Sequence, residues 1–255
     1  MLDEEPASNI RMIGHVAASR GVDALARSLR DEILANDWPQ GHPLPTERQL
    51  SEQSGLSRGS VREALRVLEA QGLLEVRAGR SGGNFVRRPD ASALRSGLGL
   101  FVHGQQISLQ ALVTTREIVE PGLAELAAAN RTPDDLHHLE LALDRMRQAR
   151  NDKLRFLEAN VAWHCAVADA SGNLLLSTFI KSISDLIHQG TAIEAADTDE
   201  ARDVVIAAHQ RIQAAIVERN GPAARRRMAR HVVSHSRAVA ETGDAELYVR
   251  KEGLK

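Results

Sequence analysis

Apolar residues near the beginning of the chain follow the spacing of an amphipathic helix. Leu25, Leu29 and Ile33 recur every four residues, so they share one face of a helix that we expect over Val22 to Ala35. The preceding stretch, residues 1–20, is polar and is expected to be frayed, whereas residues 38–45 are rich in Pro and Gly and predict a loop. A loop therefore separates this first helix from the elements that follow.

Two shorter helices joined by a tight corner are predicted next. Thr46 can cap the first of them through its hydroxyl, and Gly55 ends it. Ser57 can cap the second helix. The apolar stripe of that second helix consists of Val61, Ala64, Leu65 and Leu68. Two helices joined by a short turn that contains glycine are typical of a helix-turn-helix.

The pattern after Gly72 changes from helical to strand-like. Leu73 to Arg77 and Asn84 to Arg88 predict two short strands, joined by a glycine-rich tip from Gly79 to Gly83. A hairpin in this place forms a wing beside the two helices. Residues 57–88 contain seven arginines and three glutamates, and this local excess of four positive charges favours nucleic acid as the partner.

The polar face of the second helix suits the major groove of DNA. Arg58, Ser60 and Arg62 lie near its N-terminus, the end that a recognition helix usually inserts between the strands. Arginine can pair with guanine through two hydrogen bonds, while hydroxyl groups and other arginines hold phosphates. The alternative is a structural corner whose arginines are only solvated. The wing that follows at once favours DNA.

The segment from Leu44 to Val86 resembles the winged helix of the GntR family of bacterial transcription regulators. The resemblance implies DNA contacts at Arg48, Ser57, Arg58, Ser60, Arg62 and Gly79. Ala78 departs from the family pattern, because it has no side chain that could reach a base edge. Readout by the wing is therefore expected from Arg80 or from the backbone.

The rest of the chain predicts helices throughout. Pro89 and the small residues ASALRSG after it suggest a hinge near Asp90. The expected helices then run over Ser108 to Ala129, Pro133 to Arg150, Asp152 to Ala170, Asn173 to Gln189, Glu200 to Arg219 and Pro222 to Glu241. The residues that stand where helices should open are Ser108, Thr132, Asn151 and the pair Gly221-Pro222.

Histidines on three of these helices form a candidate metal site. Asn160 and His164 are four residues apart on one helix face, His209 lies on a later helix, and His231 follows 22 residues on. One oxygen and three imidazoles match what a divalent transition metal needs. Two alternatives stay open: the histidines are hydrogen-bonded core residues of a chain that has 10 of them, or the bundle only dimerises.

This half of the chain resembles the FCD effector domain of the FadR subfamily of GntR regulators. The residues that carry the resemblance are REIVEPGLAELAA from Arg116, ANVAWHCAVADASGN ending at Asn173, AAHQRIQAAI around His209 and MARHVVSH around His231. The family usually has Asp where this chain has Asn160, and a neutral amide predicts weaker metal binding. Zinc is expected first, with nickel and manganese as alternatives. The three histidines could instead bind an anionic effector directly or through water.

The resemblance also implies an effector site beside the metal. Arg116 is expected to reach the cavity and grip a carboxylate, although an ion pair with Glu120, four residues on, is the alternative. His235, one turn beyond His231, is expected to line the same cavity. Cys165 points about 100° away from the adjacent histidine and is expected to pack in the core.

Composition limits these interpretations. The chain has 255 residues, 43% of them apolar, which is enough for two cores of ordinary size. Its net charge of -2 means that the basic surface is local. A single cysteine excludes an internal disulfide, and no stretch reaches the roughly 20 apolar residues needed to cross a bilayer. The acidic N-terminus is unlike a signal peptide, so a cytoplasmic protein is predicted.

The sequence therefore predicts a mainly α protein with an N-terminal winged helix-turn-helix and a C-terminal all-α FCD-type helical bundle. The expected parts are a flexible N-terminus (1–20), the DNA-binding domain (21–89), a linker with a first connecting helix (90–107), an all-helical effector-binding and dimerisation domain (108–243) and a tail (244–255).

The predicted function is that of a homodimeric transcription regulator, most often a repressor in this family. It is expected to bind double-stranded operator DNA under the control of a small carboxylate, a sugar acid or a hydroxy acid. One alternative is a direct metal sensor. The other is a metal-dependent enzyme, for which Glu120 and Asp169 are candidate bases only by their nearness in sequence, and no nucleophile motif is present.

Overall fold

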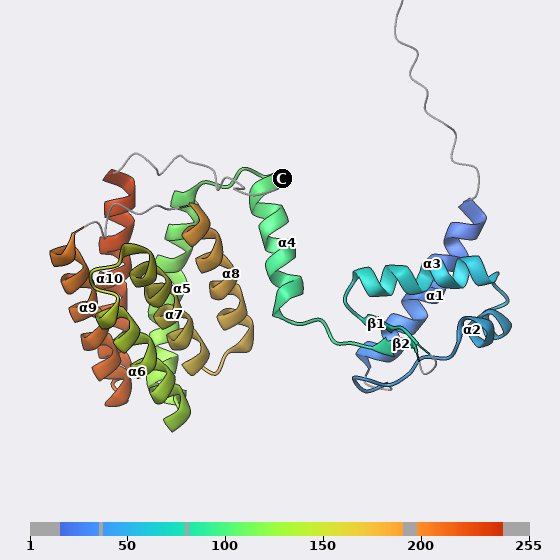
Figure 1. Ribbon diagram of the computed structural model, residues 1–255, viewed down its shortest axis with the longest axis horizontal. Helices are drawn as coiled ribbons and strands as arrows, with labels where there is room; N and C mark the ends of the chain where they lie inside the picture. The colour runs from blue at the N-terminus through green and yellow to red at the C-terminus, as the bar shows by residue number, and fades with distance from the viewer. Residues whose placement is uncertain (1–15, 36–37, 80–81, 191–197, 242–255) are drawn as a thin grey trace, which may run out of the picture. The chain divides into compact units, whose positions relative to one another are not determined.

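The computed structural model describes residues 16–35, 38–79, 82–190 and 198–241, which form ten helices and one two-stranded sheet (Figure 1). The chain divides into two compact units, residues 1–93 and 94–255. The elements are α1 (Val16–Leu34), α2 (Glu47–Ser54), α3 (Arg58–Ala70), β1 (Leu74–Arg77), β2 (Gly83–Val86), α4 (Ala91–Gly104), α5 (Leu109–Asn130), α6 (Pro133–Gln148), α7 (Lys153–Ala170), α8 (Leu174–Gly190), α9 (Asp199–Val217) and α10 (Gly221–Glu241). The prediction of a mainly α protein is confirmed.

The first unit is a winged helix-turn-helix. The apolar stripe of α3 is buried as predicted, against Ile33 of α1 and Leu50 of α2. β1 and β2 pair antiparallel with Leu74 opposite Val86, and both of these side chains enter the same core. Full burial of each large aliphatic side chain contributes about 1.5–3 kcal/mol to folding. This core fixes α3 against the wing.

The corner between α2 and α3 follows from its capping residues. Thr46 and Gln49 form a capping box at the start of α2, and Gly55 ends that helix at φ 72°, a left-handed conformation that favours glycine. The Ser57 hydroxyl then accepts the backbone N–H of Ser60 at 3.2 Å and opens α3. Each of these ends was predicted from the sequence and is confirmed.

Three expectations about helix boundaries were wrong. α1 begins at Val16, so residues 16–20 are helical rather than frayed. The segment ASALRSG is the start of helix α4 rather than an irregular linker: Asp90 accepts the backbone N–H of Ser92 at 2.9 Å, and Val102 packs in a core farther along the helix. α7 is capped by Asp152 instead of Asn151.

The second unit is a helical bundle around α5. This helix packs against α7, α8, α9 and α10, while α6 packs against α7 and α9 (Figure 1). Trp163, Leu139 and Met146 are fully buried in the largest core of the bundle. A smaller core joins Val102 of α4 to Ile183 of α8. Among the helices that the structure describes, none is long and apolar enough to cross a membrane.

Candidate functional site

The recognition helix α3 presents its predicted polar residues outward. The side chains of Arg58 and Arg62 are exposed, and the Ser57 and Ser60 hydroxyl oxygens lie 3.0 Å apart at the start of the helix. Arg48 of α2 is exposed as well, with its Nε 3.9 Å from Glu52 Oε1. The first turns of α2 and α3 therefore offer both cations and hydroxyl groups to a partner.

Arg62 is held in place by a carboxylate that the sequence did not connect with it. Its Nε and one terminal nitrogen donate to the two carboxylate oxygens of Glu47 at 3.0 and 2.7 Å. The hydrogen bond from Arg62 lowers the pKa of Glu47. The pair joins the first turn of α2 to α3, so Glu47 orients one arginine of the recognition surface.

The wing has its expected glycine-rich tip. Gly79 adopts φ 108°, a conformation that other residues rarely tolerate. A Cβ atom at Gly82 would lie 2.3 Å from the Arg77 carbonyl oxygen, so this position also needs glycine. Arg77 stacks over the ring of Phe85 at 4.2 Å. Arg80, the residue expected to read DNA, lies outside the described residues.

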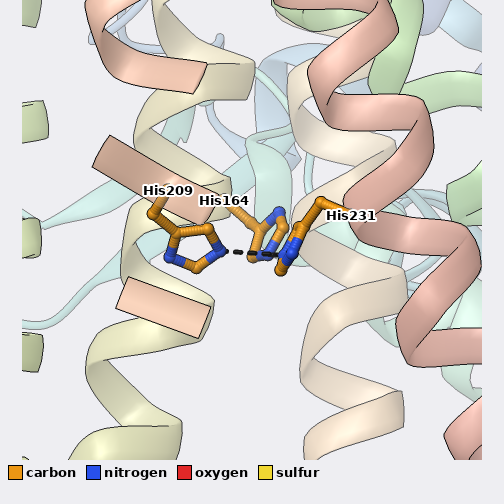
Figure 2. A group of neighbouring side chains, drawn as sticks. All are labelled: His164, His209 and His231. Atoms are coloured by element: carbon orange, nitrogen blue, oxygen red, sulfur yellow. Dashed lines mark hydrogen bonds between the residues drawn. The ribbon is translucent and has the colours of Figure 1, made fainter. Parts of the chain in front are cut away.

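Three histidines meet inside the second unit. His164 of α7, His209 of α9 and His231 of α10 point their imidazoles toward one another (Figure 2). The Nε2 atom of His231 lies 2.9 Å from that of His209 and 3.3 Å from that of His164. One nitrogen from each ring lies within 4.8 Å of the others. The structure thus brings together the three imidazoles that the sequence placed on separate helices.

Asn160 lies one turn before His164 on α7 and lines the same cavity as His164 and His231. Its Oδ1 atom is buried and has no hydrogen-bond partner among the described residues. A buried oxygen without a partner is costly, and a cation would satisfy it. Together with three nitrogen donors it fits the donor set of a divalent transition metal.

A buried chain of charges orients His164. The Nδ1 atom of His164 lies 2.7 Å from Glu120 Oε2, and the other oxygen of that carboxylate pairs with Arg116 of the same helix, α5. Burial raises the pKa of Glu120, but the charge of Arg116 and the contact with His164 outweigh it and hold the pKa below its ordinary value. A carboxylate at Nδ1 favours the proton on that nitrogen and leaves the Nε2 lone pair free for a metal.

His209 is fixed by an aromatic neighbour. The ring of Trp163 stacks on the ring of His209 with centroids 4.1 Å apart and an interplanar angle of 9°. The indole Nε1 of Trp163 donates to Gln213 at 2.9 Å, which holds the aromatic ring in position. Burial, and then the neighbouring His231, keep the pKa of His209 well below its ordinary value. The imidazole is therefore neutral at neutral pH, the form that binds metals.

A cavity of about 510 Å³ opens beside the histidines. Arg116 and His235 both line it, so Arg116 is a cavity residue and also the ion-pair partner of Glu120. Burial, and then Arg116, lower the pKa of His235 to about 3. The wall also contains three cations that the sequence analysis did not single out: Arg211, Arg227 and Arg230. The sequence did contain a signal for the two arginines of α10, because the residues of this helix that line the cavity recur every three or four positions.

Two other residues considered from the sequence lie away from the cavity wall. Asp169 is exposed, and its carboxylate accepts from Ser177 at 2.5 Å and from Lys181 at 2.7 Å. Cys165 is half-buried, and burial raises the pKa of its thiol to about 11. A protonated thiol is a poor nucleophile and a poor metal ligand. Cys165 is not a member of any of the hydrophobic core clusters, so the expectation that it packs in the core is wrong.

Comparison with known proteins identifies both units. The model for bacterial regulatory proteins of the gntR family matches residues 22–83, and the model for the FCD domain matches residues 111–234. The chain belongs to the GntR family of bacterial regulatory proteins. This GntR protein is therefore a DNA-binding transcription regulator, not an enzyme, and its FCD domain implies an effector.

Individual relatives of this GntR protein agree. It is 32% identical over 171 residues to the galactonate operon transcriptional repressor of Escherichia coli (strain K12), a match that covers 64% of this chain and 72% of the relative. It is 29% identical over 206 residues to the HTH-type transcriptional regulator LutR of Bacillus subtilis (strain 168), covering 79% and 93%. The solved structure of Streptococcus agalactiae GntR has a TM-score of 0.65 at 28% identity, covering 85% of this chain and 99% of that chain.

Proposed function

We propose that the protein is a homodimeric repressor that reads operator DNA with α3 and the wing. Arg58 and Arg62 contact base edges in the major groove, while Arg48, Ser57 and Ser60 hold phosphates. Gly79 lets the backbone of the wing approach the DNA, and readout by the wing comes from Arg80 or from that backbone. A dimer places two recognition helices about one helical turn apart on a palindromic operator.

The second part of the proposal is that a small carboxylate bound beside a divalent metal controls operator affinity. Asn160, His164, His209 and His231 hold the metal, with zinc as the first expectation. Arg116 and His235 contact the carboxylate. When bound, the metal supplies a positive charge that attracts the acid. We expect a sugar acid or a hydroxy acid, the class predicted from the sequence.

The observation that carries this proposal is the convergence of three imidazole nitrogens within 4.8 Å, beside an unpartnered amide oxygen and a cavity that contains Arg116. This arrangement disfavours the alternative that the histidines are only hydrogen-bonded core residues, because such residues do not need to bring three imidazole nitrogens together. The cavity of about 510 Å³ also favours an organic effector over direct sensing of the metal, because a metal ion alone would leave it largely empty.

The metal site is tested by removing two of its ligands. Elemental analysis of the variant His209→Ala/His231→Ala should find no bound metal, whereas the wild type should carry about one ion per chain. His137→Ala, a substitution on the exposed surface of α6, is the matched control and should keep its metal. An unchanged metal content in the double variant would place the ion elsewhere.

The effector site is tested by Arg116→Ala. This variant should bind the operator as tightly as the wild type but should no longer respond to the carboxylate, since it loses the guanidinium that grips the acid. Fluorescence anisotropy measures the operator affinity of the variant with and without the acid, and so tests whether the variant still responds. A variant that still responds would contradict the role of Arg116. Release of DNA by chelation alone, without any acid, would favour the direct metal sensor.

A further inference from the structure

The wall of the cavity carries more positive charge than one carboxylate needs. Arg211 of α9 and Arg227 and Arg230 of α10 line it together with Arg116. Arg227 precedes His231 by four residues, which is about one helical turn, or about 6 Å along α10. Arg230 precedes the same histidine directly. All three arginines line the cavity that also contains His164 and His231.

No acidic residue balances these three cations within the described part of the chain. Neither Asp nor Glu is found among the residues that line the cavity, and no described carboxylate forms an ion pair with Arg211, Arg227 or Arg230. Two of them contact backbone carbonyls instead: Arg211 Nε donates to Ala207 at 3.0 Å, and Arg227 donates to the carbonyl of Arg211. Each guanidinium has five N–H donors, so most of them stay available to a ligand.

Arg116, on the same cavity wall, does have an acidic partner. Arg116 is buried and its charge is matched by the carboxylate of Glu120, which is buried as well. The positive charges that lack an acidic partner among the described residues are therefore those of Arg211, Arg227 and Arg230. The wall also includes apolar side chains, among them Phe156, Leu157, Val205 and Val232. An occupant that fits this wall has one anionic group for Arg116 and a second for the other three arginines, joined by a short carbon chain.

We propose that the effector carries two anionic groups. The first is the carboxylate that Arg116 holds beside the metal, and this inference rests on that proposed function. The second, a carboxylate or a phosphate, binds to Arg211, Arg227 and Arg230, whose forked donors suit either group. A monocarboxylate would leave these three charges without a partner, so the arginines select for dianions.

The test compares a dicarboxylate with its own monomethyl ester, which has the same chain and one charge less. Succinate, glutarate and adipate are titrated into the zinc-loaded full-length protein by isothermal titration calorimetry, each beside its ester. At least one diacid should bind at least tenfold more tightly than its ester. 4-Phosphonobutyrate, titrated beside glutarate, distinguishes a phosphate-type group from a carboxylate, since the preferred probe identifies the second anion.

Variants at the exposed arginines assign this preference to the proposed residues. Arg211→Gln/Arg230→Gln should reduce the preference to less than threefold and leave the affinity for the ester within twofold. Arg226→Gln, an exposed neighbour on α10 that does not line the cavity, is the matched control and should retain the full preference. Arg211→Lys/Arg230→Lys, which keeps both charges, should retain part of it and shows that the loss is not a failure to fold.

The outcomes separate this inference from the proposed function. If diacids and esters bind equally well, the second anionic site is wrong while the carboxylate site beside the metal stands. If neither diacids, esters nor the phosphonate bind, the carboxylate site itself is contradicted. If the preference survives in Arg211→Gln/Arg230→Gln and in a further variant, Arg227→Gln, other residues recognise the second anion.

Discussion

Asn160 determines the charge of the candidate metal site. Three neutral imidazoles and an amide bring no negative charge to the metal, and the carboxylate of Glu120 acts only through His164. We expect Asn160→Asp to tighten zinc binding by about tenfold or more, equivalent to about 1.4 kcal/mol, because a charged oxygen replaces a neutral one. Competition with a chromophoric chelator measures this. Asn160→Ala is the matched variant and should bind more weakly; equal affinities in all three proteins would exclude position 160 as a ligand.

The buried histidines link stability to pH in the metal-free protein. Burial is the main reason why the pKa values of His209 and His231 lie well below the ordinary value, and why that of His235 falls to about 3. These groups stay neutral in the folded state at pH values where the unfolded chain already binds protons. As the pH falls below about 6.5, the unfolded state gains protons that the folded state does not, so the free energy of unfolding decreases.

Urea unfolding followed by circular dichroism between about pH 7.5 and pH 5 measures this dependence. The free energy of unfolding of the second unit should fall by up to about 1.4 kcal/mol per pH unit for each histidine. His235→Gln should reduce the slope, while His137→Gln on the exposed surface should not change it. A stability that stays constant over this range would mean that the histidines are accessible to protons in the folded protein.

Arg58 has no carboxylate partner among the described residues, in contrast to Arg62 on the same helix. Arg58→Ala should weaken binding to the preferred operator by about 1–3 kcal/mol and relax its sequence preference. Anisotropy titrations with specific and scrambled duplexes measure both effects. Arg27→Ala, an exposed substitution on α1, is the control. Unchanged affinity of Arg58→Ala would remove this residue from the DNA interface.

At the scale of elements, the corner between α2 and α3 depends on one backbone conformation. Gly55 has φ 72°, and a Cβ atom added there would meet open space, so Gly55→Ala should cost about 1–2 kcal/mol of the first unit's stability through conformation alone. Gly59→Ala, inside α3 and without a close contact, is the matched control and should be neutral or stabilising by about 0.5–1 kcal/mol. Denaturant unfolding compares the two. Equal effects would contradict the role given to the left-handed turn.

The elements that could be predicted from the sequence are those with local signals. Thr46, Gly55 and Ser57 define helix ends through their own side chains or backbone, so both ends of α2 and the start of α3 were found. A connecting helix was expected within residues 90–107, but its start was placed too late, because ASALRSG contains small residues and glycine that are typical of linkers. That helix is stabilised by tertiary packing of Val102 against α5 and α8, which no local pattern reports.

The candidate site likewise has features that the sequence could predict and features that it could not. The spacing of Asn160 and His164, four residues apart on one helix, could be predicted because helical periodicity fixes which residues share a face. The pair between Glu47 and Arg62 depends on the angle between two helices, and the grouping of Arg211 with Arg227 depends on how α9 packs against α10. Sequence spacing does not determine either geometry.

The two compact units of the chain carry different parts of the proposed function. The first unit carries the basic DNA-binding surface, while the net charge of the chain is only -2, so binding to DNA is a local electrostatic event. The second unit contains the cavity. If the effector changes operator affinity, the operator must change effector affinity by the same factor.

The measurement that tests the central claim most directly is operator binding with and without effector. Duplexes covering the DNA around the protein's own gene are titrated with the zinc-loaded protein by fluorescence anisotropy, alone and with the anion that binds most tightly in the calorimetric series. We expect one duplex to bind far more tightly than its scrambled form, and the anion to change this affinity at least tenfold. The claim is contradicted if, at low ionic strength, no duplex is preferred over its scrambled form, or if no bound anion alters operator affinity.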